Sequence, residues 1–463
     1  MTRPTALAAV LTLAFAAAVG GQPPPTPPMP TKPAAPAPNP DVEKALELFK
    51  QNKVPDALEL LKKAAKANPA LPQPKLQLAQ WCLQANNGQL ARQFIEQAIA
   101  EDRTHVEGYV FNGNVAFNEG RVTEAILNLQ TAEALAREPR WDAEQRKRFL
   151  RNIRDGLASC FTARGDYDAA KEHLRGMLNE DPKNGLLRQR LAEVVFRGGK
   201  PEEAFDELTK AFADDATLDP PDLRMAVLWQ GKSTASGAAT AAEADRKKAE
   251  DHFKKAVTAH PKNAKCHREY AVWLMEDGRT DAAGLYVEAM TAIDPAGRDT
   301  LAAKALWHLH RKEYAAAEAV LEGIMKDAPG DSFASGYLCV ALAESGDEKK
   351  RKRAVELAET LVRANQRAPL PYAVLGWSLL KAGKVDDADK ALGVVLSAGQ
   401  VSLDTAYYLA RLLAEKQKFE EAHRILKEAV SSPHGLFVYR QEAKVWLPEL
   451  AKKVPEKKDE PKK

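Results

Sequence analysis

The sequence lacks most of the features on which enzymes and disulfide-stabilised proteins depend. It has only four cysteines in 463 residues, and they lie far apart, which excludes a dense disulfide framework. The motifs HExxH, GxSxG, GxxxxGK[ST] and GxGxxG are absent, so no zinc-protease, serine-hydrolase, P-loop or dinucleotide-binding site is indicated. Aromatic residues make up 7% and the formal net charge is +3, so no broad field for binding polyanions is expected.

The histidines do not form a metal-binding pattern either. His308 and His310 are the nearest pair in the sequence, but residues two apart on a helix point to different faces and cannot chelate as an i, i+4 pair can. We therefore expect no catalytic residue, no metal and no cofactor. A hydrolase-type or glycan-processing enzyme is kept as an alternative that activity assays would expose.

Residues 370–400 contain a pattern that predicts two helices joined by a tight turn. Gly383 is placed to end the first helix in a left-handed conformation, and Asp386 is placed as the N-cap of the second. Gly376 and Ala388 are small where the two helices must touch. The buried faces at helical spacing are Tyr372, Leu375, Gly376 and Leu379, then Ala388, Leu392 and Val395.

The same pattern recurs along the chain. The small residue of the first helix is found at Ala45, Ala79, Gly113, Ala158, Ala192, Ala226, Ala271, Ala305, Cys339, Gly376 and Ala410. The alanine of the second helix is found at Ala57, Ala91, Ala125, Ala170, Ala204, Ala249, Ala283, Ala317, Ala354, Ala388 and Ala422. Both columns advance by 34 residues, with two interruptions of 45 and one of 37. A close copy spans residues 106–135, with Tyr109, Gly113, Gly120, Ala125, Leu129 and Ala132.

A 34-residue helical hairpin repeat resembles the tetratricopeptide repeat family, with about eleven repeats over residues 41–434. The resemblance implies an all-α fold, a right-handed solenoid of helix–turn–helix repeats in which each hairpin packs on its neighbours. It also implies that first helices line a concave inner wall, where peptides or helices of partner proteins dock.

Three interruptions of the period carry separate expectations. High helical propensity around residues 137–147 predicts an elongated helix pair. The Gly, Ser and Thr content of residues 231–241 predicts a longer, mobile loop between two helices. The third interruption adds three residues to a turn and contains the basic run Lys349–Arg353, which is interpreted as a solvated loop and not as a nucleic-acid site.

The two ends of the chain differ from the repeats in composition. Residues 1–20 resemble a secretory signal peptide, with Arg3 in the n-region and cleavage expected near Gly20; an uncleaved membrane anchor is the alternative. Residues 21–40 are a proline-rich linker. Residues 435–453 are predicted to form a helix that caps the last repeat, with Phe437, Val438, Val445 and Trp446 on its apolar face, and residues 454–463 a charged disordered tail.

Two sets of first-helix residues are candidates for the inner wall. The N-terminal half is rich in amides, which pair with a peptide backbone without a charge: Gln77, Gln80, Gln84, Asn114, Asn118 and Asn152, with Phe117 and Ser159 beside them. The C-terminal half carries side chains typical of binding hot spots: Phe333, Tyr337, Trp377, Tyr407, Tyr408 and Arg411. As an alternative, Phe117, Phe333 and Trp377 pack between neighbouring repeats.

These patterns predict a non-enzymatic scaffold that is exported to the periplasm, the cell envelope or the medium and binds proteins. No nucleic acid, no small-molecule substrate and no membrane contact beyond an uncleaved N-terminus are expected. A structural or self-associating spacer is the alternative. Cys82, Cys160, Cys266 and Cys339 are expected to be buried free thiols, since each lies on a first helix of a different repeat.

Overall fold

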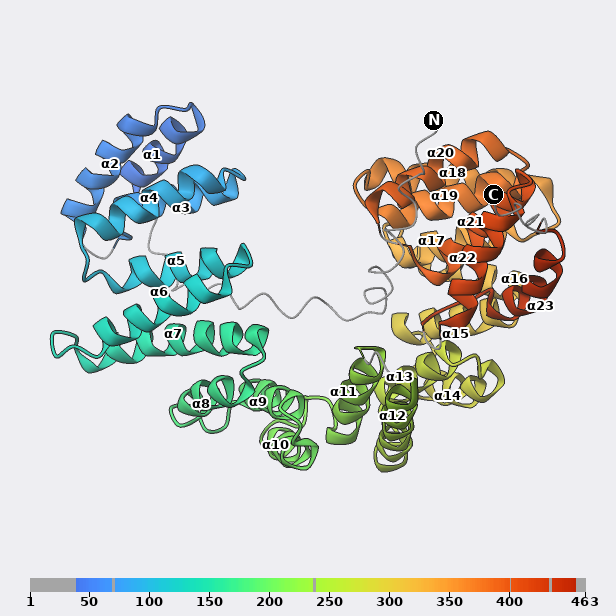
Figure 1. The fold of residues 1–463 in the computed structure, drawn as a ribbon, viewed down its shortest axis with the longest axis horizontal. Coiled ribbons are helices and arrows are strands. Elements are labelled where there is room, and N and C mark those ends of the chain that lie inside the picture. The colour runs from blue at the N-terminus through green and yellow to red at the C-terminus, as the bar shows by residue number, and fades with distance from the viewer. Residues whose placement is uncertain (1–38, 69–70, 236–238, 400, 433–434, 455–463) are drawn as a thin grey trace, which may run out of the picture. The chain divides into compact units, whose positions relative to one another are not determined.

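The computed structural model describes residues 39–68, 71–235, 239–399, 401–432 and 435–454. Over these residues the chain contains 23 helices and no β-strand, arranged as successive hairpins (Figure 1). The predicted signal peptide, almost all of the predicted proline-rich linker and all but Val454 of the predicted C-terminal tail lie outside the described residues. The chain divides into two units, one ending at Pro221 and one beginning at Asp222, and each is described separately.

The unit that ends at Pro221 consists of five hairpins in the described residues. Their helices are α1 (Pro40–Lys50), α2 (Val54–Ala67), α3 (Pro74–Gln84), α4 (Gly88–Glu101), α5 (Val106–Asn118), α6 (Val122–Ala136), α7 (Ala143–Arg164), α8 (Tyr167–Leu178), α9 (Gly185–Arg197) and α10 (Pro201–Asp214). Each odd-numbered helix packs on the even-numbered helix that follows it, so the hairpins are the packing units of a solenoid.

The unit that begins at Asp222 consists of six hairpins and one further helix in the described residues. Its helices are α11 (Pro221–Ala235), α12 (Ala239–Ala259), α13 (Ala264–Glu276), α14 (Thr280–Ile293), α15 (Arg298–His310), α16 (Tyr314–Asp327), α17 (Ser332–Ala343), α18 (Glu348–Ala364), α19 (Pro369–Lys381), α20 (Val385–Ala398), α21 (Leu403–Glu415), α22 (Phe419–Ser431) and α23 (Arg440–Ala451). The eleven hairpins of the two units agree with the eleven repeats expected.

The small-residue columns lie where the two helices of each hairpin meet. Every alanine of both columns is fully buried. A Cβ added to Gly113 would come within 2.8 Å of the Leu129 side chain, and one added to Gly376 within 2.5 Å of Leu392. Larger side chains would therefore push the helices apart, which explains the 34-residue recurrence of small residues.

The hairpin turns repeat in conformation as well as in position. A left-handed residue follows the first helix in nine hairpins: Asn52, Asn86, Gly120, Gly165, Gly199, Gly278, Lys312, Gly383 and Gln417. Glycine adopts this conformation freely, whereas other L-residues are strained in it. The α17–α18 hairpin, which contains the three-residue insertion, has no such residue among those described, and residues 236–238 in the turn of α11–α12 lie outside the described residues.

The insertions lengthen helices and do not form long loops. The first is absorbed by α7, which has 22 residues and begins with a capping box between Asp142 and Gln145. For the second, the prediction of a long loop over residues 231–241 is wrong, because α11 continues to Ala235 and α12 begins at Ala239. Ser233 is buried, and its hydroxyl donates a hydrogen bond of 2.7 Å to the backbone oxygen of Gln230, which satisfies this polar group inside a helix.

The basic run is also helical. Lys349–Arg353 forms the first turns of α18, so the solvated loop expected there is not observed. Lys350 pairs with Glu318 at 2.7 Å and Arg353 with Glu322 at 2.5 Å, both on the preceding second helix. Because its charges are partly matched within the protein, the run is a structural feature of the repeat stack. In the neighbouring repeat, the N-cap of α20 is Lys384, and Asp386 lies in the first turn, where a carboxylate favours the helix dipole.

Candidate protein-interaction surfaces

First helices of neighbouring hairpins contact each other in both units. In the unit ending at Pro221, α5 contacts α7; in the other unit, α13, α15, α17, α19 and α21 contact each other in series. Within the described residues no two second helices approach as closely. We call the face formed by the first helices the inner wall, which is the name that the resemblance gives it.

The inner wall of the first unit carries the amide side chains. Gln77, Gln80 and Asn114 are half-buried, and Gln84, Asn118 and Asn152 are exposed. None of the six side chains has a hydrogen-bond partner among the described residues. The amides are therefore free to donate to and accept from a bound chain. Phe117 beside them is half-buried.

The wall changes character at α7 and α9. Ser159 donates to the backbone oxygen of Asp155 and accepts from the Arg190 guanidinium at 2.7 Å. Arg190 also pairs with the Asp155 carboxylate. This hydrogen-bond network joins two neighbouring hairpins, so Ser159 has a structural role and is not available to bind a ligand.

The aromatic wall of the second unit is not open, which corrects the expectation for its residues. Trp377 and Tyr407 are each 3% exposed and Tyr408 is 4% exposed. Trp377 stacks on Tyr408 with ring centroids 4.5 Å apart, and Tyr407 stacks on Tyr439 at 4.7 Å. The rings are buried because the chain's own C-terminal segment covers them.

The other three predicted residues lie at the edges of this aromatic cluster. Arg411 donates to the Tyr407 hydroxyl at 2.9 Å and lies 3.9 Å above the Trp446 ring. Phe333 and Tyr337 are half-buried and contact each other with centroids 4.8 Å apart. Arg298 of α15 lies 5.1 Å from the Phe333 ring centroid, and Trp377 of α19 stacks on Tyr408 of α21. These contacts agree with the alternative that Phe333 and Trp377 pack between neighbouring repeats.

The C-terminal segment was expected to cap the last repeat, and it does more than that. The helix α23 packs on α22, but it begins only at Arg440, and the predicted apolar-face residue Val445 is 67% exposed. Phe437, Val438 and Tyr439 precede the helix and are buried. We call residues 436–442 the inner-wall segment, because their contacts run along the first helices.

Four contacts trace the inner-wall segment across five repeats. The Tyr439 backbone N–H donates to Asp404 in α21 at 3.4 Å, and its hydroxyl donates to Glu344 at the end of α17 at 2.8 Å. Glu442 pairs with Lys312 after α15 at 2.9 Å. The Arg440 guanidinium donates to the backbone oxygen of Glu276 in α13 at 3.2 Å. These partners are up to 164 residues away in sequence.

Burial perturbs the charged groups around this segment. It raises the pKa of Glu276 to about 7. It also raises the pKa of Asp404 to about 7, against the effect of backbone N–H donors from Tyr439 and Val438. Burial, together with the positive charge of Arg440, lowers the pKa of His310 to about 4.

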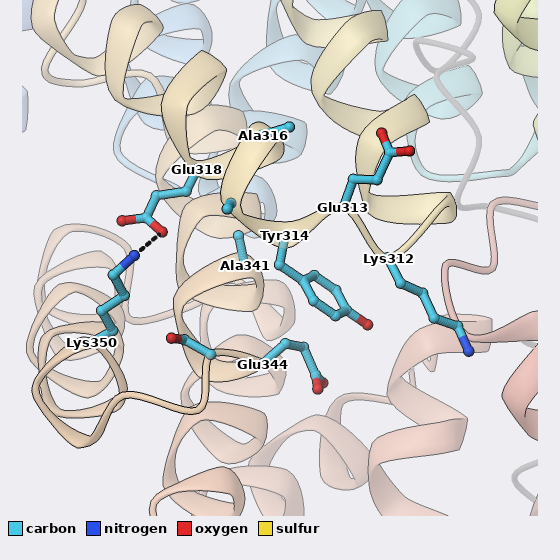
Figure 2. Close-up of a pocket in the computed structure, with 10 residues that line it drawn as sticks. Lys312, Glu313, Tyr314, Ala316, Glu318, Ala341, Glu344 and Lys350 are labelled. Carbon is cyan, nitrogen blue, oxygen red and sulfur yellow. Dashed lines mark hydrogen bonds and ion pairs between the residues drawn. The ribbon is translucent and has the colours of Figure 1, made fainter.

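A pocket of about 500 Å³ lies beside the residues that contact the inner-wall segment, between the hairpins α15–α16 and α17–α18 (Figure 2). The Tyr314 ring lies between Lys312 and Glu344, and Lys350 pairs with Glu318 on its other side. Glu344 accepts from Trp377 at 3.1 Å and Lys381 at 2.8 Å as well as from Tyr439. Sequence reasoning missed this pocket, because its residues come from separate repeats.

The cysteines of the chain are buried in the structure. All four cysteines are buried, as expected, and burial raises the pKa of Cys160 to about 11 and of Cys339 to about 12. Neutral buried thiols are poor nucleophiles. No group of three potential metal ligands occurs in the ranges that the structure describes, and none of the helices in those ranges is long and apolar enough to cross a bilayer.

Comparisons with known proteins agree with this architecture. Models of the tetratricopeptide repeat family match residues 48–109, 161–227 and 373–435. Cellulose synthase operon protein C of Pseudomonas fluorescens (strain SBW25) is 22% identical over 286 residues, which cover 60% of this chain and 22% of that protein. The match thus spans about a fifth of that relative's length.

The solved structures that match this chain are distant from it in sequence. A tetratricopeptide repeat protein from Parabacteroides merdae ATCC 43184 is 15% identical with a TM-score of 0.38, over 65% of this chain and 99% of that one. Yeast Tom70 is 12% identical with a TM-score of 0.33, over 89% of this chain and 95% of that one. On its hairpins, their 34-residue register and the matching family models, this chain is a tetratricopeptide repeat protein, a scaffold for protein–protein interaction.

Proposed function

We propose that the chain is an exported, non-enzymatic scaffold that binds an extended peptide of a partner protein along the amide side chains of α3, α5 and α7. The observation that carries the proposal is the set of six amides without hydrogen-bond partners on one wall. An extended peptide presents backbone N–H and C=O groups on both sides, and amides supply the complementary acceptor and donor without a charge.

Amides elsewhere in the same unit support this reading by contrast. Asn112 donates to Asn128 at 2.9 Å, and Gln73 and Asn87 accept from backbone N–H groups at helix N-termini. Those side chains stabilise the fold. The inner-wall amides have no such structural role among the described residues, so binding accounts for them better than stability does.

Substitution of the wall amides tests the proposal. Each amide–backbone hydrogen bond contributes about 1 kcal/mol, so the triple variant Gln80→Ala, Asn114→Ala, Asn118→Ala should lose about 3 kcal/mol of binding free energy, roughly 100-fold in affinity. A matched control replaces two exposed amides on second helices, Gln89→Ala and Gln130→Ala.

The measurement is quantitative recovery of partners on each immobilised variant, followed by affinity measurement with the recovered partner. The triple variant should lose the partner and the control should retain it, with equal helicity by circular dichroism. Equal recovery by all three proteins would refute docking on the amide wall and favour the structural or self-associating spacer.

Export is the second part of the proposal, and its support is the composition of residues 1–20. The mass of the protein isolated from cells tests it. A mature N-terminus near Gly21 is expected, and a full-length chain in the membrane fraction would indicate the uncleaved anchor in its place.

A further inference from the structure

The inner-wall segment occupies the surface that a partner peptide would use in the second unit. Its residues before α23 are not helical, and Phe437 is fully buried between the repeats. Tyr439 contacts three rings of the wall, those of Trp377, Tyr407 and Tyr408, with centroids 4.7 to 5.7 Å apart. In geometry, the segment is a peptide bound in the groove of its own chain.

Several buried polar atoms in and around the inner-wall segment have no hydrogen-bond partner. Within the described residues, Arg440 Nε, Glu276 Oε1, Glu442 Oε2 and His310 Nε2 are buried and have no hydrogen-bond partner. Leaving a buried polar atom unpaired costs free energy, more so for charged groups. The segment is therefore held less tightly than its buried rings alone would suggest.

The pocket beside Tyr314 gives access to the anchor of the segment. Glu344, which accepts the Tyr439 hydroxyl, lines this pocket together with Lys312, which pairs with Glu442 (Figure 2). Two of the four contacts that hold the segment thus lie at an opening. A competing chain can reach them before the buried aromatic cluster is disturbed.

We propose that residues 436–442 are a displaceable internal ligand. They close the inner wall formed by α13 to α21 until a partner segment of the same chemistry, an aromatic residue followed by arginine, takes the Tyr439 and Arg440 positions. The inference concerns a different unit from the amide wall, so either proposal can fail without the other.

Hydrogen exchange of the unmodified full chain is the first test. If the segment opens on its own, amides of residues 437–446 should exchange at least tenfold faster than those at the centres of α19 and α21. Equal protection in the segment and in these helices would show that it leaves only on unfolding, and would overturn the proposal.

Binding of a synthetic peptide is the second test. A fluorescent peptide with the sequence of residues 435–447, GLFVYRQEAKVWL, is titrated onto the full chain and followed by anisotropy. The Arg440→Ala variant, in which the internal segment is loosened, should bind it at least tenfold more tightly than the unmodified chain does. Val445→Ala is the matched control, since Val445 is exposed on the same helix and should leave binding unchanged.

The chemistry of the ligand is tested with the same assay. A peptide with alanine in place of its tyrosine and arginine should not bind Arg440→Ala. Equal binding of both peptides, or no gain in Arg440→Ala over the unmodified chain, would overturn the proposal. Exchange between labelled copies, giving dimers in place of peptide binding, would overturn the internal assignment. If Arg440→Ala loses protection throughout α13 to α21, hydrogen exchange of the unmodified chain decides alone.

Discussion

Replacing Gly376 with alanine tests whether close helix contact sets the repeat. The new Cβ would lie 2.5 Å from Leu392 Cγ and 2.9 Å from its Cδ2. Leu392 is fully buried, so it has no free space into which to move. Overpacking of this kind costs about 1–3 kcal/mol, whereas glycine to alanine inside a helix gains about 1 kcal/mol. The expected net effect is a loss of about 1 kcal/mol, within a range from no change to about 2 kcal/mol.

The same hairpin contains a matched control. Gly393 in α20 has no atom within 4 Å of its ideal Cβ position, so Gly393→Ala should keep the helix gain and stabilise by about 1 kcal/mol. The two substitutions are chemically identical and differ only in what the methyl group meets. The specific expectation is therefore that Gly376→Ala is less stable than Gly393→Ala by about 1–3 kcal/mol, the cost of overpacking.

Native-state hydrogen exchange of α19 and α20 measures both effects locally, and a change of 1.4 kcal/mol corresponds to about tenfold in exchange rate. A double variant completes the test: in a Leu392→Ala background the clash is removed, so Gly376→Ala should no longer destabilise. A stabilising Gly376→Ala in the unmodified background, equal to that of Gly393→Ala, would refute helix contact as the origin of the small-residue column.

Three further predictions concern single groups. Gln417 is exposed with φ of 59°, so Gln417→Gly should stabilise the α21–α22 hairpin by about 1 kcal/mol in the same exchange experiment, and destabilisation would contradict a strained turn. Burial raises the pKa of Asp404 from 3.8 to about 7 in the folded state, so the folded state binds more protons than the unfolded state between these pH values. Protection of residues 437–446 against hydrogen exchange should therefore fall as the pH rises from 5.5 to 8, and Asp404→Asn should reduce this pH dependence. An unchanged pH dependence in Asp404→Asn would argue against the assignment to Asp404. Iodoacetamide at pH 8 should leave Cys160 and Cys339 unmodified in the native protein and alkylate both in urea, and rapid native modification would contradict their burial.

The hairpins themselves were predictable from sequence, because the forces that define them are local. A helix pair, its turn and its contact column all lie within 34 residues, so the spacing from Gly376 to Ala410 already contains the register. The left-handed residue after the first helix can be predicted from sequence where it is a glycine, as at Gly383. One repeat later the same backbone conformation is adopted by Gln417, which the sequence does not indicate.

The secondary structure of the inserted segments was harder to predict from sequence, because their composition favours a loop whereas their packing favours a helix. Glycine, serine and threonine in residues 231–241 favour a loop locally. In the structure Ser233 is buried with its hydroxyl satisfied, and Ala242 is buried in α12. Burial against neighbouring helices outweighs the weak local propensity of a short segment.

Sequence alone determined the repeat, its count, and which residues lie on first helices. Only the tertiary structure decided which of those residues are open to a partner. The amides of α3 and α5 remain uncovered, whereas Trp377 and Tyr407 are covered by Tyr439, and Arg440 reaches Glu276 across 164 residues. A row of aromatic side chains looks the same in sequence whether solvent, a partner or the chain's own end lies against it, because that contact is made between segments whose separation has no period.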